Sequence, residues 1–279
     1  IMACRRTLTS AAKKLPLEGV RVVDLSRVLA GPFATQLLGD LGADVIKVER
    51  TRVGDDTRQW GPPFRNGESA YFLCANRNKR SLAVDLKSEK GQRLVQRLTE
   101  DADVVVENYK VGDAEKLGLG YDTLAARNPR LVYASITGYG RDGPCAHYPG
   151  YDFMAQAVGG LMGITGTDGP AKVGVAITDL CTGLYAHGAI MAALLARDKS
   201  GVGQRVDASL LETQVSMLAN IASNFLVADV NAVPRGNAHE SIVPYQLFPT
   251  ADVDLVVGAG NDGQFQRLAT VVSSDVQTY

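Results

Sequence analysis

Short runs rich in valine and isoleucine alternate with helical patterns along the first half of the chain, and this alternation limits the fold more than any other feature. The segment VRVVDLS at 20–26 predicts a strand, AGPFATQLLGDLGA at 30–43 has apolar residues at helical spacing, and DVIKVER at 44–50 predicts another strand. The same patterns predict strands at 80–87, 102–109 and 131–140 and a helix over 88–102 that Ser88 caps.

Strands with near-continuous apolar runs, separated by helices, are typical of a parallel sheet that is covered on both faces. The chain is therefore predicted to have an α/β fold. In such sheets ligands bind outside the carboxyl ends of the strands, so the functional residues are expected there.

The balance of charges narrows the choice of partner. Lys and Arg number 29 against 30 Asp and Glu, so no basic surface for a nucleic acid is expected and the partner is predicted to be a small molecule. The most apolar stretch, Gly188 to Ala196, is much shorter than the roughly 20 residues of a membrane span, so no membrane association is expected. The cysteines lack C-x-x-C spacing, so neither a disulfide framework nor a metal site is expected. They are Cys4, Cys74, Cys145 and Cys181.

The opening segment IMACRRTLTSAAKK is basic, has no acid before Glu18 and is rich in alanine and hydroxyl residues. This composition is typical of a mitochondrial presequence, which predicts a mitochondrial protein. The alternative is the basic terminus of a cytoplasmic protein. Because Ile1 precedes Met2, the sequence is expected to be incomplete at this end.

Two common nucleotide-binding motifs are missing. The segment SRVLAGPFATQLLGDLG after the first strand does not have the G-x-G-x-x-G spacing, which disfavours a nicotinamide dehydrogenase, and no P-loop occurs. Charge gathers instead in KVER at 47–50 and NRNKRS at 76–81, both beside predicted strand ends. Such cations can hold the phosphates of a nucleotide-like ligand, although a solvated basic loop is the alternative for each cluster.

A carboxylate stands at the start of an apolar helix. In VAITDLCTGLYAH, Asp179 precedes a segment of small and apolar residues that is predicted to form a buried helix ending at Lys199 and Gly201. The residues alone leave two roles open. Asp179 either caps the helix by accepting hydrogen bonds from its first N–H groups, or it is a reactive group.

Several segments occur in an order that is found in a known family, namely PLEGVRVVDLSRVLAGPFATQLLGDLGADVIKVER, NRNKRSLAVDLK, ADVVVENY, ASITGYG and GYDFMAQAVGGLMGITG. Through these segments, over about residues 16–270, the chain resembles the class III CoA-transferase family of the CaiB/BaiF type. Within it, ITDLCTGLYAHGAIMA and SIVPYQLF make the chain most similar to the succinate–hydroxymethylglutarate CoA-transferases.

The resemblance implies an architecture. It implies a basic N-terminal segment over 1–15, a Rossmann-like, CoA-binding large domain over 16–225, and a linker with the start of a second, smaller domain over 226–279. It also implies that family members continue beyond this chain and that two subunits interlock as a homodimer.

The resemblance implies that Asp179 is the nucleophile. In this family such a carboxylate moves CoA between a donor, such as succinyl-CoA, and a dicarboxylic acid, such as glutarate or hydroxymethylglutarate, through an aspartyl anhydride and an aspartyl thioester. The coenzyme A thioester is then a substrate, and neither ATP nor a metal takes part.

Contacts to CoA are also implied by position. Arg50 and Lys87 are expected to bind phosphate or ribose, and Asn108 and Tyr109 to line the adenine or pantetheine path. Leu29 and Ala30 are expected to contact CoA through their backbone. The full implied set is Leu29, Ala30, Arg50, Asp85, Lys87, Asn108, Tyr109, Lys116, Tyr151 and Asp152.

Two other hypotheses are kept beside the transferase. Racemases of the same fold place a histidine where this sequence has Tyr151, and a tyrosine with its ordinary pKa near ~10 is a poor base at neutral pH, which disfavours a racemase-like isomerase. The third hypothesis is a CoA-binding protein without catalytic activity. His187 lies on the apolar helix and is expected to pack there rather than to act as a base.

Overall fold

The computed structural model describes residues 14–167 and 169–272, and these fall into two compact units. The first unit comprises the chain up to residue 159 together with 174–217, and the second comprises 160–173 together with the chain from residue 218. The expected presequence therefore lies almost entirely outside the described residues.

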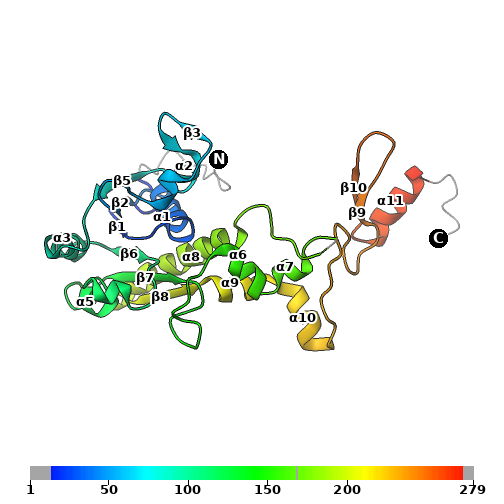
Figure 1. Ribbon diagram of the computed structural model, residues 1–279. Helices are drawn as coiled ribbons and strands as arrows, with labels where there is room; N and C mark the ends of the chain where they lie inside the picture. Colours follow the sequence, from blue (N-terminus) through cyan, green and yellow to red (C-terminus); the bar gives the residue numbers. More distant parts are fainter. Residues whose placement is uncertain (1–13, 168, 273–279) are drawn as a thin grey trace. The chain divides into compact units, whose positions relative to one another are not determined.

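A six-stranded sheet forms the centre of the first unit (Figure 1). Its strand order is β5-β2-β1-β6-β7-β8, and every neighbouring pair is parallel. The order runs outward in both directions from β1, as it does in Rossmann folds, which confirms the predicted Rossmann-like parallel sheet. The strands are β1 (Arg21–Asp24), β2 (Asp44–Glu49), β5 (Lys79–Ala83), β6 (Val104–Glu107), β7 (Val132–Thr137) and β8 (Arg205–Ser209).

The central strands follow the sequence pattern most closely. β6 and β7 are buried at every residue, because each has a strand on both sides and helices on both faces. β5 and β8 lie at the edges and are partly exposed, and the polar sequence RVDAS of β8 gave no strand prediction. The strands predicted at 20–26, 44–50, 80–87, 102–109 and 131–140 are confirmed with shorter bounds.

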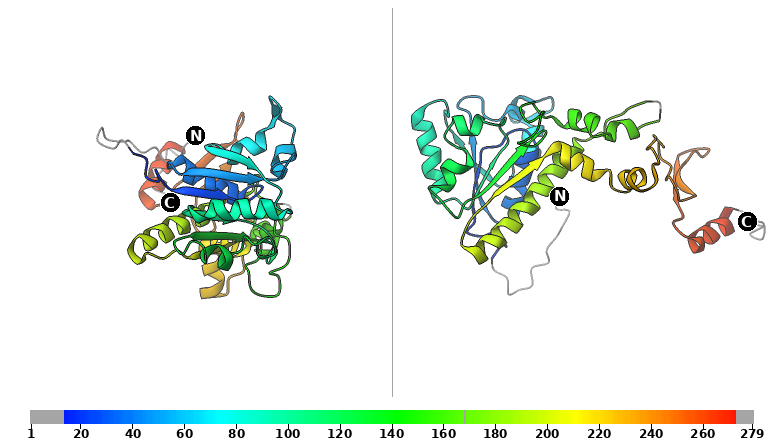
Figure 2. Two further views of the ribbon diagram at one scale, coloured as in Figure 1. Left: turned by 90° about the vertical axis from the view of Figure 1, so that its left-hand side faces the viewer. Right: turned by 90° about the horizontal axis from the view of Figure 1, so that it is seen from below.

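Helices cover both faces of the sheet (Figure 2). On one face Val22 of β1 belongs to a core with α1 (Ala30–Asp40) and α8 (Ile177–Ser200). On the other face Val23 belongs to a core with α3 (Glu89–Glu100). Neighbouring residues of one strand serve opposite cores because side chains alternate across a strand.

The predicted helix ends are confirmed. The side chain of Ser88 accepts a hydrogen bond of 3.1 Å from the N–H of Gly91 and so caps α3. α8 ends at Ser200, and Gly201 follows with φ of 78°. Glycine adopts this left-handed conformation at little cost, which is why it commonly terminates helices.

α8 corrects the argument that no segment reaches the length of a membrane span. Among the described residues, it is the one helix that is long and apolar enough, by length and composition alone, to cross a membrane. Polar residues such as Thr182 and His187 interrupt the apolar run, so the sequence does not show one long apolar stretch. Core helices pass the same test, and α8 packs on the sheet through the fully buried Ala186 and Ile190.

Shorter elements complete the first unit. They are the 3₁₀ helix η1 (Asp56–Gln59), the hairpin β3 (Phe64–Arg65) and β4 (Glu68–Ser69), and the helices α2 (Ala70–Ala75), α4 (Asp113–Lys116), α5 (Tyr121–Ala125), α6 (Asp152–Val158) and α9 (Leu210–Met217).

The second unit is small. Its strands β9 (Tyr245–Phe248) and β10 (Leu255–Gly258) pair in antiparallel fashion. The expected domain boundary after residue 225 falls inside this unit and stays a prediction. Its helices are α7 (Leu161–Ile164), α10 (Ala219–Ala228) and α11 (Asp262–Val272).

Candidate active site

Two cavities of the first unit are lined by residues that follow the carboxyl ends of the strands. The first has a volume of about 480 Å³ and the second about 410 Å³. Arg27, which follows β1, and Tyr109, which follows β6, line both cavities. β1 and β6 are the strands between which the strand order reverses, and this is where sheets of this type bind ligands.

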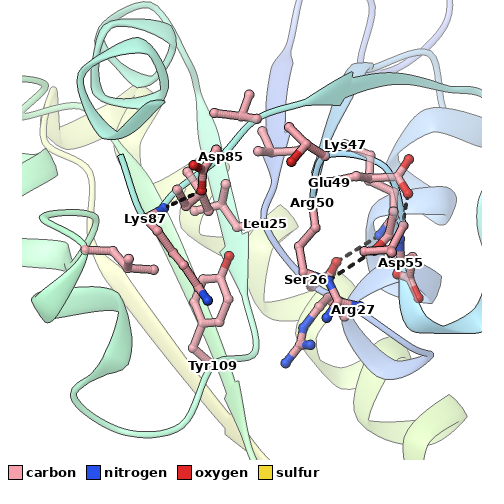
Figure 3. Close-up of a pocket in the computed structure, with 17 residues that line it drawn as sticks. Leu25, Ser26, Arg27, Lys47, Glu49, Arg50, Asp55, Asp85, Lys87 and Tyr109 are labelled. Carbon is pink, nitrogen blue, oxygen red and sulfur yellow. Dashed lines mark hydrogen bonds and ion pairs between the residues drawn. The ribbon is translucent and has the colours of Figure 1, made fainter. Parts of the chain in front are cut away.

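The first cavity brings together four residues that were predicted to contact CoA, namely Arg50, Asp85, Lys87 and Tyr109. Figure 3 shows Lys87 and Tyr109 on one side of this cavity, with Arg27 and Ser26 on the other. Asp85 accepts a hydrogen bond of 3.0 Å from the N–H of Lys87, which fixes the turn after β5. Cationic side chains therefore reach the cavity from several strand ends.

The second cavity contains most of the other predicted residues. Asp179 lies in its wall, and Trp60 and Tyr148, which sequence reasoning missed, line it as well. The predicted residues along it are Leu29, Ala30, Asn108, Tyr109, Tyr151 and Asp179.

Two predicted contact residues line neither cavity. Lys116 lies on α4, where it is fully exposed and forms an ion pair of 2.8 Å with Asp113. Asp152 lies at the start of α6 and is not among the residues that line the second cavity. The predicted CoA contacts of both residues stay predictions.

A polar network holds the turn after β1, where many nucleotide-binding proteins use glycines. The buried Asp24 accepts hydrogen bonds from the backbone N–H and the hydroxyl of Ser26, at 2.9 and 2.5 Å. The buried Lys47 donates to the carbonyl of Ser26 at 2.8 Å and pairs with Asp55 at 2.9 Å. Lys79 pairs with Asp24 at 3.0 Å, and burial lowers its pKa to about 8. The network places the next residue, Arg27, at the boundary of the two cavities.

Asn108 holds the same turn from the neighbouring strand. Its side-chain oxygen accepts from the N–H of Arg27, and its side-chain nitrogen donates to the carbonyl of Arg27, each at 2.8 Å. The amide of Asn108 is therefore occupied by the backbone, although the residue also lines the second cavity. Its observed role is to fix the turn.

The start of α8 shows which residue caps this helix. Oδ1 of Asp152 accepts hydrogen bonds from the backbone N–H groups of Thr178, at 2.8 Å, and Asp179, at 3.2 Å. Its Oδ2 accepts from Nε2 of Gln156 at 2.6 Å. Asp152 therefore performs the capping that the sequence left open for Asp179. The carboxylate of Asp179 accepts no hydrogen bond from any described residue and is left available in the cavity wall.

The surroundings of Asp179 disfavour its charged form. Burial, followed by the like charge of Asp152, raises the pKa of Asp179 to about 7. Near neutral pH the group is thus divided between carboxylate and acid. A partly buried carboxyl group with a raised pKa and no structural hydrogen bond is typical of a catalytic site.

Aromatic rings line the space around this carboxyl group. Trp60 lies in the wall of the second cavity and contacts Tyr71 edge to face, with ring centroids 5.2 Å apart. Burial, and then the charge of Asp179, raises the pKa of Tyr71 to about 12, so its hydroxyl stays protonated. A single tryptophan in a loop gives no sequence signal of its position. Arg27 could have been found, because it directly follows the first strand.

Other candidate groups contribute little. His187 lies on α8 outside both cavities, and burial lowers its pKa, in accord with a packed residue. Within residues 14–167 and 169–272, no group of three or more His, Cys, Asp or Glu side chains is placed to hold a metal ion.

Comparison with known proteins gives a consistent match. The model of the CoA-transferase family III matches residues 17–278. The chain is 55% identical to a succinyl-CoA:glutarate CoA-transferase of Mus musculus, across 92% of this chain and 60% of the relative. It is 50% identical to a succinate–glutarate CoA-transferase of Agrobacterium fabrum, across 93% of this chain and 67% of that relative. The chain thus spans about three fifths of the length of the mouse protein.

Comparison with solved structures finds a protein of the same type. A crystal structure of a CaiB/BaiF family protein from Brucella suis superimposes with a TM-score of 0.86 and 49% identity, across 93% of this chain and 70% of that chain. The matched region contains both cavities and Asp179. The chain belongs to the CoA-transferase family III.

Proposed function

We propose that this protein is a CoA-transferase that moves CoA from a donor such as succinyl-CoA to a dicarboxylic acid such as glutarate or hydroxymethylglutarate. The observation that carries the proposal is the position of the Asp179 carboxyl group in the wall of the second cavity. It is not used to cap α8, because Asp152 accepts the hydrogen bonds from the start of that helix. Relatives named for succinyl-CoA and glutarate support the choice of substrates.

The reaction needs one nucleophile and no external proton donor. The carboxylate of Asp179 attacks the thioester carbonyl, the carbon–sulfur bond breaks, and a mixed anhydride and CoA thiolate result. The thiolate then attacks the aspartyl carbonyl of the anhydride, which releases the donor acid and leaves an aspartyl–CoA thioester. The acceptor carboxylate attacks this thioester and releases the thiolate again. Attack of the thiolate on the acceptor carbonyl gives the new CoA ester and restores Asp179.

The two cavities suggest how CoA is held. Arg50 and Lys87 in the first cavity suit the phosphates of the nucleotide, because guanidinium and ammonium groups pair with phosphate oxygens. The pantetheine arm then passes Tyr109 into the second cavity, where the thioester meets Asp179. Leu29 and Ala30 begin α1 in the wall of this second cavity, so their backbone lies beside the arm.

The raised pKa of Asp179 fits this chemistry. Attack requires the carboxylate, so the first half-reaction should accelerate as the pH rises through about 7. A carboxylate that is destabilised by burial and by Asp152 is also less shielded than one held by hydrogen bonds. It is correspondingly more reactive toward a carbonyl carbon.

A direct test is to incubate the full-length protein with succinyl-CoA and a panel of dicarboxylic acids and to follow new CoA esters by mass spectrometry. The proposal expects glutaryl-CoA or hydroxymethylglutaryl-CoA to form without ATP. Exchange of deuterium at the carbon next to the thioester, without transfer of CoA, would instead indicate the racemase-like isomerase. Binding of CoA with neither reaction would indicate a non-catalytic CoA-binding protein.

We also propose that the protein is mitochondrial and forms a homodimer. The basic, hydroxyl-rich segment at 1–14 supports the location, and family membership supports the dimer. Import into isolated mitochondria and sedimentation of the full-length protein would test the two points separately.

A further inference from the structure

Arg27 occupies the boundary between the two cavities. It lies in the turn after β1, and the amide of Asn108 bonds both its N–H and its carbonyl group. Arg27 and Tyr109 line both cavities, so a ligand that passes from one cavity to the other must pass the guanidinium group of Arg27. In a CoA molecule placed as proposed above, the diphosphate joins the nucleotide to the pantetheine arm and lies at this boundary.

One carboxylate already holds the arginines at this place. Oδ2 of Asp56 pairs with the guanidinium of Arg27 at 2.9 Å, and its Oδ1 pairs with the guanidinium of Arg50. Asp56 itself lines the second cavity. The acid therefore uses both of its oxygens on two guanidinium groups, which is the arrangement that phosphate oxygens would adopt.

The position of Asp56 does not depend on the two arginines. Asp56 begins η1, and the preceding residue, Asp55, caps that helix by accepting from the N–H of Thr57 at 2.9 Å. Asp55 is fixed in turn by its ion pair of 2.9 Å with the buried Lys47. The backbone of Asp56 is therefore held at the site independently of the two arginines.

Arg27 also has bonding capacity that Asp56 does not use. Its Nε is buried and has no hydrogen-bond partner among the described residues. A buried donor without a partner is unfavourable, so Asp56 does not satisfy the whole guanidinium group. Tyr109 lines the same two cavities as Arg27.

We propose that Asp56 competes with the phosphates of CoA for Arg27 and Arg50 and thereby limits how tightly CoA is held. This inference rests on the proposed function. The ion pairs of Asp56 are partly exposed, with Arg27 at 41% and Arg50 at 50% side-chain exposure, so phosphate can displace them at small cost. The carboxylate stays nearby and repels the bound phosphates. Weaker binding of CoA favours turnover by a transferase, because the new CoA ester must leave the site after each reaction.

The test compares Asp56→Asn with the wild type in the full-length protein, by calorimetric titration with CoA and with pantetheine. Asparagine keeps the size of the side chain and removes the charge. CoA should bind about 5- to 20-fold more tightly to the variant, and the gain should shrink in high salt because exposed charges are screened. Pantetheine lacks the phosphates, so its Kd should not change.

Asp44→Asn is the matched control. Asp44 forms an exposed ion pair with Arg80 at 2.6 Å and lies at the amino end of β2, on the opposite edge of the sheet from the cavities. This variant changes the net charge equally and should bind CoA like the wild type. Combining Asp56→Asn with Arg27→Gln should remove most of the gain.

The possible results distinguish failure of the competition by Asp56 from failure of the proposed function. If the wild type binds CoA and Asp56→Asn binds it equally or more weakly, the competition does not exist. An equal gain for pantetheine would also overturn it, because that gain cannot involve phosphate. Asp56→Ser must tighten CoA binding as well, which excludes an effect peculiar to asparagine. If the wild type binds no CoA, the proposed function itself fails.

Discussion

The carboxyl group of Asp179 should reduce the stability of the folded protein at neutral pH, and Asp179→Asn should restore it. Folding raises the pKa of this group from 3.8 to about 7, chiefly through burial. Each pKa unit corresponds to about 1.4 kcal/mol, so the shift implies up to about 4 kcal/mol. Because the group lies in a cavity wall and keeps some contact with solvent, we expect about 2–4 kcal/mol.

The size of the effect depends on pH. Below the unfolded pKa near 3.8, the acid is protonated in both states and contributes nothing. As the pH rises from about 4 to about 7, the unfolded chain ionises first, and the folded state becomes progressively less favourable. Above the folded pKa the difference is constant. The variant should therefore be more stable than the wild type at pH 8, with little difference near pH 4.

Denaturant unfolding of both proteins at pH 4 and pH 8 measures this effect, with the free energy of unfolding as the observable. Asp198→Asn is a suitable control, because Asp198 lies on the same helix with its side chain 67% exposed and should show no pH-dependent gain. A variant Asp179→Asn that is no more stable than the wild type at pH 8 would refute the reasoning. It would show that the folded protein accommodates the carboxylate without cost.

Three further predictions concern the site. Arg50→Ala should weaken CoA binding by about 1–3 kcal/mol, the usual effect of losing a charge-assisted hydrogen bond, and an unchanged Kd in calorimetry would remove Arg50 from the site. Asn108→Ala removes both hydrogen bonds to the backbone of Arg27, so it should lower the unfolding free energy by about 1–3 kcal/mol and reduce kcat/KM; unchanged denaturant curves would contradict this. Burial is the larger cause of the raised pKa of Asp179, and Asp152→Asn removes the second cause, its like charge, so the pH profile of acyl transfer should move toward lower pH; a profile that stays in place would contradict the contribution of Asp152.

The parallel sheet could be predicted from the sequence because its signal is local. Val104, Val105 and Val106 are consecutive, fully buried residues, and such a run specifies a central strand without knowledge of its neighbours. Edge strands carry less of this signal. β8 reads RVDAS and has one sheet neighbour, so its sequence retains polar residues and no strand was predicted there.

The polar framework of the site could not be predicted, because its partners lie far apart in the chain. Asp152 caps a helix whose first residues come 26 positions later, and no spacing rule links the two. Lys79 and Asp24, which hold the turn after β1, are 55 positions apart. Position in the family indicated that Asp152 belongs to the site, but only the folded structure shows that it holds the start of α8.

Lys116 was also predicted to contact CoA, but it lines neither cavity. Its place in the chain suggested a CoA contact, whereas the structure shows an exposed side chain paired with Asp113 on α4. A charged residue on the surface of a short helix carries no local signal that separates a solvated group from a ligand contact. Substitution by alanine with measurement of CoA affinity would test that assignment.

The role of Asp179 as nucleophile can be measured most directly by trapping. Full-length protein is incubated with succinyl-CoA alone, without acceptor acid, and then treated with hydroxylamine, and peptides that contain residue 179 are examined by mass spectrometry. The mechanism predicts an acyl or CoA adduct on Asp179 that hydroxylamine converts to a hydroxamate, and neither product in Asp179→Asn, although that variant stays folded. Near-normal CoA transfer by Asp179→Asn, or an adduct on another residue, would contradict the mechanism.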